Sequence, residues 1–520
     1  MALLQSIPGI NGTAEVQEGA FAVPAELTVE RGGFDPWCLS AFASRLAEKG
    51  FAPLVFKDGG AALRLRRDGA YAPEAYTLEV ERAGISLTAS GERGIIQGLT
   101  SLFERLAGRE IPCCRLSDRP RYGHRGFMLD CSRHFFESAE IERILEEMAL
   151  VKLNIFHWHL SDDQGWRIES RAFPKLHAGG PRYTQEEIRR IVAFARDRGI
   201  EVIPEIDLPG HTTALLSVYP ELSCREEPVS PVTGGGIFPI ILCAGKERVY
   251  EFLFTLLDEI ADLFDSPLIH LGGDEAPKTE WEQCEHCKAA LKRLGLEDFE
   301  DLQGHFTARL AEHLAGKGKK VRCWNDILKS RVLPGNMDIQ YWVEWDASGG
   351  LESYFDRGGG VVFSDMFSLY FDYPASFSSL QKVFRYEPAI GGRSRAASPN
   401  TAGVEACLWT ERVPTAAALE RAIFPRLFAL AETAWAGPGD YRDFEDRLRL
   451  KLETLKTRGV SFTPLEQCNP EGEARLAEIA RFWKEFQASS GGIELAVPPE
   501  TMAEMSKAMA RGFNLPELPL

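Results

Sequence analysis

The chain has 520 residues, of which 44% are hydrophobic, so it is long enough for several domains and a large core. Its 76 acidic and 59 basic residues give a formal net charge of −17. This balance argues against a nucleic-acid partner, which would need a basic face. No apolar stretch reaches the ~18 residues of a membrane-spanning helix, so we expect no membrane span.

The N-terminal segment lacks the basic and apolar regions of a signal peptide, so we expect a cytoplasmic protein, or a secreted one if a leader was removed. The eleven cysteines, an odd number, lie mostly in apolar runs and are expected to be reduced, packed thiols. Cys284 and Cys287 form one CxxC pair, but no second pair stands at the spacing of a zinc site. The sequence therefore predicts no metal and no cofactor.

Residues 1–118 are expected to form a mixed α/β domain. Alternating apolar and polar residues predict two half-buried strands, and helical spacing predicts two helices. These strands are Leu27–Glu30 and Ala75–Val80, and the helices are Phe42–Lys49 and Arg93–Leu106. Prolines and arginines then break the pattern at Ile111–Tyr122, which we interpret as the domain boundary.

Between residues 119 and 437, strand-like runs alternate with amphipathic helices. The eight runs are Gly126–Asp130, Asn154–Leu160, Glu201–Leu208, Pro267–Gly272, Lys320–Trp324, Met337–Trp342, Gly360–Met366 and Gly403–Trp409. The clearest helices are Ala139–Lys152, one ending at Gly199, Glu247–Phe264, Leu302–Lys317 and Thr415–Trp435. Eight such repeats predict an α/β fold of the closed (β/α)₈ type, the TIM barrel.

Capping residues support two of these helices, whereas the helices after the fifth and seventh strands are weakly marked. Ser138 is expected to cap the first helix, and Thr184 with Glu187 forms a capping box for the second. The remaining residues, 438–520, predict a helical extension. Its helices are Tyr441–Arg458, Glu471–Ser489 and Glu500–Arg511.

Polar and aromatic residues collect directly after the eight runs, where a barrel of this type carries its active site. They include Asp130, Arg133, Asp162, Asp163, Asp207, His211, Asp274, Glu275, Trp324, Trp342, Tyr370, Asp372, Trp409 and Glu411. Carboxylates and an arginine can bind sugar hydroxyls, and tryptophans can cover the apolar face of a pyranose. This composition is typical of a site for a glycan.

The central feature is the stretch His270–Glu275, in which two glycines separate an apolar run from Asp274 and Glu275. Buried carboxylates must be paired or must hold a proton, so a pair placed here favours general acid chemistry. Two other interpretations stay open at this point: the pair could bind a hard metal ion, or the barrel could bind glycans without cleaving them. His157 and His159 are expected to fill the barrel or to form a structural hydrogen bond, and a zinc pair there would lack an obvious third ligand.

The chain resembles the β-N-acetylhexosaminidases of glycoside hydrolase family 20. The motifs that carry the resemblance are Leu129–Phe135, His159–Arg167, Asp207–Thr212, His270–Glu275 and Leu408–Glu411, in the order of that family. Gly91–Thr100 is similar to a stretch of the small domain that precedes the family's barrel. Together the similarity covers roughly residues 20–440.

The resemblance implies a retaining exo-enzyme that removes terminal β-linked GlcNAc or GalNAc from a glycan. In this family the substrate's 2-acetamido oxygen is the nucleophile and forms an oxazolinium intermediate, a recognised exception to the scheme with two protein carboxylates. Glu275 would be the general acid and base, and Asp274 and Tyr370 would hold the acetamido group. Asp162 and His211 would form a polar relay to Glu275.

By the same resemblance, Trp324, Trp342 and Trp409 would wall the pocket. The ring hydroxyls would be bound by Arg133, Asp372 and Glu411. The sequence departs from the family at Glu405, where glutamine is expected, and it lacks a tryptophan between Asp372 and Gly403, which Phe384 or Tyr386 would replace. The choice between GlcNAc and GalNAc, the natural glycan and the oligomeric state stay open.

Overall fold

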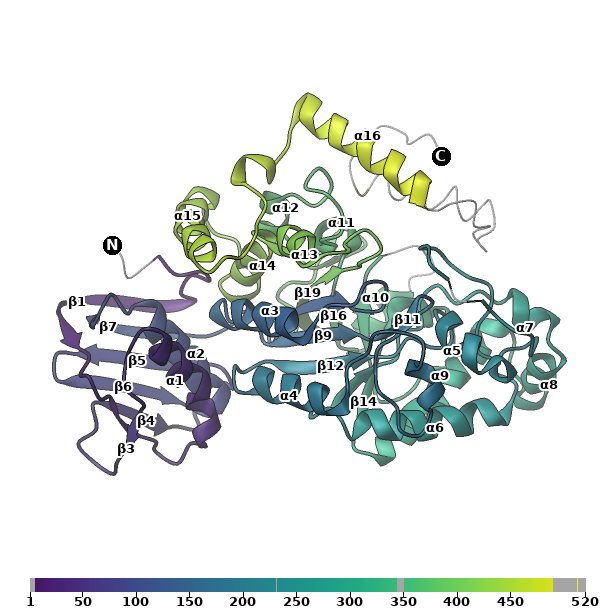
Figure 1. Cartoon of the computed structure of the whole chain (residues 1–520), viewed down its shortest axis with the longest axis horizontal. Coiled ribbons are helices and arrows are strands. Elements are labelled where there is room, and N and C mark those ends of the chain that lie inside the picture. Colours follow the sequence, from purple (N-terminus) through teal and green to yellow (C-terminus); the bar gives the residue numbers. More distant parts are fainter. Residues whose placement is uncertain (1–4, 231, 344–349, 490–511, 513–520) are drawn as a thin grey trace.

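The N-terminal residues fold into a mixed seven-stranded sheet on which two helices pack (Figure 1). In a computed structural model that describes residues 5–230, 232–343, 350–489 and 512, the strand order is β1-β7-β5-β6-β4-β2-β3. The strands are β1 (Gly12–Ala22), β2 (Thr28–Glu30), β3 (Val55–Phe56), β4 (Leu63–Arg67), β5 (Tyr76–Glu81), β6 (Gly84–Ala89) and β7 (Glu110–Asp118). The helices are α1 (Ser40–Glu48) and α2 (Glu92–Glu104).

The interpretation of Ile111–Tyr122 as a break between domains was wrong for most of its length. Residues Glu110–Asp118 form β7, which pairs with both β1 and β5. Pro112 is tolerated because the pairing with β5 ends at Cys114, so the missing N–H of Pro112 breaks no hydrogen bond on that side. Only the residues after Asp118 connect the sheet to the barrel strand that begins at His124.

The predicted closed barrel of eight parallel strands is confirmed, in the order β12-β13-β14-β15-β16-β19-β8-β9. Each of the eight predicted runs overlaps one of its strands. They are β8 (His124–Asp130), β9 (Ile155–His159), β12 (Glu201–Glu205), β13 (Leu268–His270), β14 (Lys320–Trp324), β15 (Met337–Tyr341), β16 (Val361–Phe363) and β19 (Thr401–Leu408). Short hairpins also form, from β10 (Ser161–Asp162) with β11 (Gly165–Trp166) and from β17 (Ala389–Ile390) with β18 (Arg393–Ser394).

Helices surround the barrel, but they are uneven in length. The long ones are α3 (Ser138–Leu150), α4 (Gln185–Arg196), α6 (Glu247–Ala261) and α9 (Phe299–Gly316). The shorter ones are α5 (Thr213–Val218), α7 (Thr279–Gln283), α8 (Glu285–Leu294), α10 (Gly350–Asp356), α11 (Met366–Leu369) and α12 (Leu380–Phe384). A 3₁₀ turn at Asn325–Lys329 follows β14, in line with the weak helical pattern there.

Two expectations about the helices were wrong in detail. The cap of α3 is Glu137, which forms a capping box with Glu140, and Ser138 is already inside the helix. The predicted helix Thr415–Trp435 is divided into α13 (Ala416–Ile423) and α14 (Arg426–Trp435), because Pro425 lacks the N–H that a continuous helix needs. The capping box of Thr184 and Glu187 is confirmed.

The C-terminal extension contributes α15 (Tyr441–Thr457) and α16 (Gly472–Ser489), which lie beside the barrel (Figure 1). The predicted helix Glu500–Arg511 lies outside the described residues. Within the described part of the chain, the helices are too short or too polar to cross a membrane.

A buried ion pair joins the N-terminal sheet to the barrel. The Lys152 ammonium donates to Asp118 at 2.8 Å and to the Tyr76 hydroxyl at 3.0 Å, and both charged side chains are at most 1% exposed. Trp435, at the end of α14, donates to the other Asp118 oxygen at 2.9 Å, and its ring covers the Lys152 ammonium. The interface therefore depends on two charges that have lost their water.

We expect Lys152→Met to lower the free energy of unfolding by about 3–5 kcal/mol, because it leaves Asp118 buried without its counter-charge. Urea unfolding measures this loss. In Lys152→Met/Asp118→Asn the loss should be smaller than the sum of the two single effects, because neither charge is then left alone. Lys57→Met, at an exposed site, is the control and should shift stability by less than about 0.5 kcal/mol.

Candidate active site

The turn after β13 brings Asp274 and Glu275 to the carboxyl end of the barrel. Gly272 has φ +62°, and a Cβ on it would lie 1.9 Å from Asp207 Oδ1. The same Asp207 oxygen accepts a hydrogen bond from the Gly273 N–H at 3.0 Å. Glycine is therefore required at position 272, both for the backbone conformation and for this close approach.

His211 lies between two pairs of carboxylates. Its Nδ1 atom is 3.2 Å from Asp163 Oδ2 and 3.3 Å from Asp162 Oδ1. Its Nε2 atom is 3.8 Å from Asp274 Oδ2 and 3.7 Å from Glu275 Oε2. One imidazole therefore connects the end of the second barrel strand to both carboxylates that follow the fourth.

The charges around His211 favour its protonated form. Burial opposes the charge, but the charge of Asp162 and the close carboxylates of Asp163 and Glu275 outweigh burial and hold the pKa of His211 well above its usual value. Asp163 is itself fixed by the Thr213 N–H at 2.9 Å, so the ring has a defined orientation. An imidazolium in this place can stabilise negative charge on either neighbouring carboxylate.

Asp162 is the carboxylate that anchors this group. Arg133 Nη2 lies 2.8 Å from Asp162 Oδ2, and His159 Nε2 lies 2.9 Å from the same oxygen. Burial opposes ionisation of Asp162, but the charges of Arg133 and His211 hold its pKa below the usual range. Asp162 therefore stays negative and holds both cations in position.

Asp274 lies in surroundings that disfavour its charge. Burial, and next the charge of Asp207, raise the pKa of Asp274 well above its usual value, although His211 opposes this. Burial similarly raises the pKa of Asp207 to about 7. Asp274 Oδ1 is buried and accepts no hydrogen bond from the described residues, so it is available to a donor on a ligand.

Aromatic side chains form the wall next to these carboxylates. Trp324 Nε1 donates to Glu205 at 2.8 Å, and Trp342 Nε1 donates to Asp326 at 2.7 Å, so both indoles are fixed. The Tyr370 ring stacks on Trp342 with centroids 6.4 Å apart and planes at 13°, and it lies 6.2 Å from Trp409. The structure thus brings the three predicted tryptophans and Tyr370 together.

The three residues expected to bind hydroxyls lie close to this aromatic wall. The Arg133 guanidinium lies over the Trp409 ring at 5.0 Å, and its Nη2 atom is 3.9 Å from Glu411 Oε1. Asp372 lies 3.7 Å from Arg412, and its Oδ1 atom accepts no hydrogen bond from the described residues. Burial, opposed by Arg412, raises the pKa of Asp372 to about 7.

Sequence reasoning missed a buried polar layer beneath the site. Glu205 on β12 lies within 3.2 Å of ring nitrogens of His157, His159 and His270, which come from β9 and β13, the strands on either side of β12. The alternation of His157 and His159 on β9 was the available signal, and we expected both to fill the barrel or to form a structural hydrogen bond. The structure shows both, because each histidine is hydrogen-bonded to buried carboxylates inside the barrel.

Glu405, the departure from the family pattern, belongs to the same layer. Its two oxygens contact His157 Nδ1 at 2.8 Å, His124 Nε2 at 2.7 Å and Gln340 Nε2 at 2.7 Å. A Cβ on Gly126 would lie 2.2 Å from Glu405, so this glycine leaves the room that the carboxylate needs. The Glu405 side chain therefore lies inside the barrel, below the aromatic wall.

The suggestion that Phe384 replaces the missing tryptophan was wrong. Its ring packs 4.8 Å from that of Phe444 on α15 and 5.3 Å from that of Tyr441, inside the core. Instead, the extension brings Phe482 of α16 next to the site, 5.5 Å from the Tyr373 ring. The sequence pattern of α16 had given no indication of this contact.

Comparison with known proteins assigns the chain to a family. The pattern described as glycosyl hydrolase family 20, catalytic domain, matches residues 122–438, and the family's domain 2 matches residues 7–119. The chain belongs to glycoside hydrolase family 20. This membership confirms the prediction from the sequence motifs that the protein is a glycoside hydrolase of the β-hexosaminidase class.

Two curated relatives carry the name β-hexosaminidase. The protein of Akkermansia muciniphila is 34% identical over 409 residues, which cover 73% of this chain and 82% of that protein. The protein of Porphyromonas gingivalis is 32% identical over 425 residues, which cover 75% of this chain. The chain spans only 54% of the length of the Porphyromonas relative.

Solved structures show the same architecture. The β-N-acetylhexosaminidase of Bacteroides fragilis matches with a TM-score of 0.81 and 29% identity, covering 90% of this chain and 99% of that one. An exo β-N-acetylglucosaminidase of Vibrio harveyi, solved with N-acetylglucosamine, matches with a TM-score of 0.79 and 27% identity, covering 89% of this chain and 79% of that one.

The buried layer makes stability depend on pH. Burial opposes a charge on His157, but Glu405 and Glu205 outweigh burial and raise its pKa to about 9, above the ~6.5 of an unfolded chain. The folded state then holds the proton that the unfolded state loses, so this stabilisation is complete below pH ~6.5 and is lost as the pH rises towards 9. It amounts to about 3 kcal/mol.

We expect Glu405→Gln to reduce this dependence, because it removes one of the charges that keep His157 protonated. Between pH 6.5 and 9, the urea midpoint should fall less in the variant than in the unchanged protein. Glu312→Gln, on an exposed part of α9, is the control and should follow the unchanged protein. Parallel pH curves for Glu405→Gln and the unchanged protein would contradict the assignment.

Proposed function

We propose that the protein is a retaining exo-β-N-acetylhexosaminidase that removes terminal β-linked GlcNAc or GalNAc by substrate-assisted catalysis. The observation that carries this proposal is the pair Asp274 and Glu275, both within 4 Å of the same His211 nitrogen and adjacent to a wall of three tryptophans and Tyr370. A site of this kind can bind a pyranose and supply one acid group.

In the proposed mechanism, Glu275 protonates the glycosidic oxygen as the bond to the anomeric carbon breaks. Its side chain is 25% exposed, so it can reach both the leaving group and, later, a water molecule. The 2-acetamido oxygen of the substrate attacks the anomeric carbon from the opposite side. Glu275 then removes a proton from the water that opens the oxazolinium ring, and two inversions give overall retention.

Asp274 holds the acetamido group in the position for attack. Its free Oδ1 atom can accept the amide N–H, and its negative charge stabilises the positive charge that develops on the ring. Burial and the charge of Asp207 raise the pKa of Asp274, which favours its neutral form, and a positive charge on the ring would lower that pKa and favour the carboxylate. The Tyr370 hydroxyl would donate to the acetamido carbonyl.

Asp162 and His211 act as positioning residues in this scheme. Asp162 keeps His211 charged, and the imidazolium lies against both Asp274 and Glu275. When Glu275 gives up its proton, this cation stabilises the carboxylate that remains. Arg133, Asp372 and Glu411 would bind the hydroxyls of the terminal sugar, which fits the exo mode named for the Vibrio harveyi relative.

Glu275→Gln should slow hydrolysis of an alkyl N-acetyl-β-glucosaminide by roughly 10²–10⁴-fold, because the poor leaving group needs its proton. With a nitrophenyl leaving group the loss should be much smaller. Steady-state kcat/KM on the two substrates measures the difference. Full activity of Glu275→Gln on the alkyl substrate would exclude Glu275 as the acid.

Asp274→Asn should be slow on both substrates, because the nucleophile loses the partner that orients it. Two further readouts separate this role from damage to the fold. The unchanged enzyme should bind a thiazoline analogue of the cyclised intermediate more tightly than GlcNAc, and Asp274→Asn should lose that preference. A β-glucoside without the acetamido group should be hydrolysed far more slowly, and equal rates would contradict substrate assistance.

A further inference from the structure

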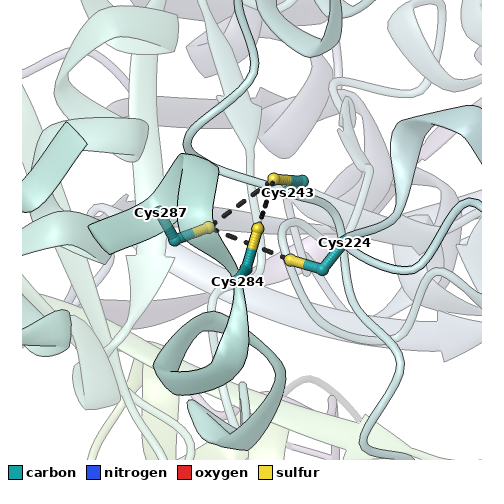
Figure 2. Close-up of side chains that lie close together, drawn as sticks. All are labelled: Cys224, Cys243, Cys284 and Cys287. Atoms are coloured by element: carbon teal, nitrogen blue, oxygen red, sulfur yellow. Dashed lines mark hydrogen bonds between the residues drawn. The ribbon is translucent and has the colours of Figure 1, made fainter. Parts of the chain in front are cut away.

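Four cysteines that are dispersed in the sequence meet at one place beside the barrel. Cys224 and Cys243 come from the connection between β12 and α6, and Cys284 and Cys287 come from the connection between β13 and α9. Figure 2 shows the four sulfur atoms pointing towards one another. The sequence predicted no metal because it showed one CxxC pair; the structure supplies the two missing partners.

The distances between the sulfur atoms fit a tetrahedral ion. Cys243 Sγ lies 3.5 Å from Cys287 Sγ and 3.7 Å from Cys284 Sγ, and Cys224 Sγ lies 3.8 Å from Cys287 Sγ. All four lie within 4.8 Å of one another. Zinc–sulfur bonds of ~2.3 Å in a tetrahedron place the sulfur atoms ~3.8 Å apart.

The same distances argue against a pair of disulfides. A disulfide requires its sulfur atoms ~2.05 Å apart, and the two nearest contacts share one atom, Cys243 Sγ. Packing of apolar thiols does not account for the arrangement either, because it gives no reason for four sulfurs from three segments to converge on one point. A thiol is a weak hydrogen-bond donor and gains little from three others.

The surrounding backbone holds the four residues in this arrangement. Cys284 precedes α8 and Cys287 lies in its first turn, where free N–H groups stabilise thiolate charge. A short antiparallel bridge between Ser223 and Leu242 places Cys224 and Cys243 diagonally opposite each other on the same face of the two segments. A Cβ on Gly245 would lie 2.2 Å from the backbone of His286, so glycine allows the two connections to touch.

We propose that Cys224, Cys243, Cys284 and Cys287 bind one structural Zn²⁺ ion. Each cysteine would lose its proton on binding, so the site would hold four thiolates around a divalent cation. All four coordination positions would be filled by the chain, which leaves none for water or substrate, so the ion would have no part in hydrolysis. Tetrahedral sulfur sites of this type select zinc or iron.

The ion would join the two connections that carry the candidate acid and its partner. The first, between β12 and α6, carries His211, and the second, between β13 and α9, carries Asp274 and Glu275. The first also reaches the sugar-binding side: Gln164 Nε2 donates to Gly234 O at 2.7 Å, while Gln164 Oε1 accepts from Arg133 at 3.0 Å. Zinc between the two connections would therefore fix the positions of His211 and of the pair Asp274 and Glu275 relative to each other.

Metal analysis of the purified 520-residue protein tests the proposal. We expect one zinc per chain after dialysis against metal-free buffer, and release of that zinc on titration with a mercurial. After removal of zinc, Co²⁺ should produce the intense visible bands of a tetrahedral cobalt thiolate site. Substoichiometric metal together with no Co²⁺ spectrum would overturn the proposal, and so would stoichiometric iron or disulfides at these cysteines in mass spectra.

Cysteine variants locate the site. Cys284→Ala and Cys287→Ala should each lose at least half of the bound zinc and lower the thermal midpoint, whereas Cys114→Ala, a buried thiol of the N-terminal sheet, should keep all of it. Full zinc content in Cys284→Ala/Cys287→Ala would contradict the assignment. If these variants do not fold, alkylation of the unchanged protein decides: four cysteines should become reactive only after zinc is removed.

This inference is independent of the proposed function. Glu275→Gln should hydrolyse the alkyl substrate roughly 10²–10⁴-fold more slowly and still contain one zinc per chain. Loss of zinc should raise KM, because the connections move, whereas direct catalysis by the ion would instead abolish kcat. Active protein that contains no zinc as purified would overturn only the metal site, and zinc-containing protein without hydrolase activity would overturn only the hydrolase proposal.

Discussion

The interior of this barrel is organised around buried charge. Such interiors are ordinarily filled by layers of branched aliphatic side chains. Here Glu205 and Glu405 are both fully buried, and each is surrounded by histidines from other strands. Burial opposes ionisation of Glu205, but His270 and His159 hold its pKa well below the usual range. An uncompensated carboxylate in this place would be very costly, so the histidines and the carboxylates depend on each other.

This layer orients the residues above it. Glu205 fixes the Trp324 indole and one nitrogen of His159, and the other nitrogen of His159 contacts Asp162. Asp162 in turn holds Arg133 and His211. A continuous set of contacts therefore runs from the middle of the barrel to the candidate acid, with the aromatic wall attached to the same carboxylate. Preorganisation of this kind lets a site stabilise charge without rearranging during the reaction.

The strand ends could be predicted from the sequence because each apolar run is followed at once by polar residues, and parallel strands must place those residues at one edge. Contacts between segments that are distant along the chain could not be predicted in the same way. Because of Pro112, the sequence pattern did not indicate β7. The last residue of β7, Asp118, forms the buried ion pair with Lys152 that joins the two domains. Phe384 had the right position along the chain for a sugar-binding ring, but α15 draws it into the core. Cys224 and Cys243 showed no spacing motif, because their partners come from another connection.

The two residues at the centre of the site have unfavourable backbone conformations. Glu275 has φ +46° and His211 has φ +50°, which lie in the left-handed region of backbone conformation that residues other than glycine rarely occupy. Such strain persists only where the surroundings determine the backbone. Asp207 holds Gly273 on one side, and Asp163 holds Thr213 on the other. These hydrogen bonds fix each turn close to its strand, while the four cysteines join the two connections farther out. A metal ion there would keep both strained turns in register with each other, a constraint that hydrogen bonds within either connection cannot supply.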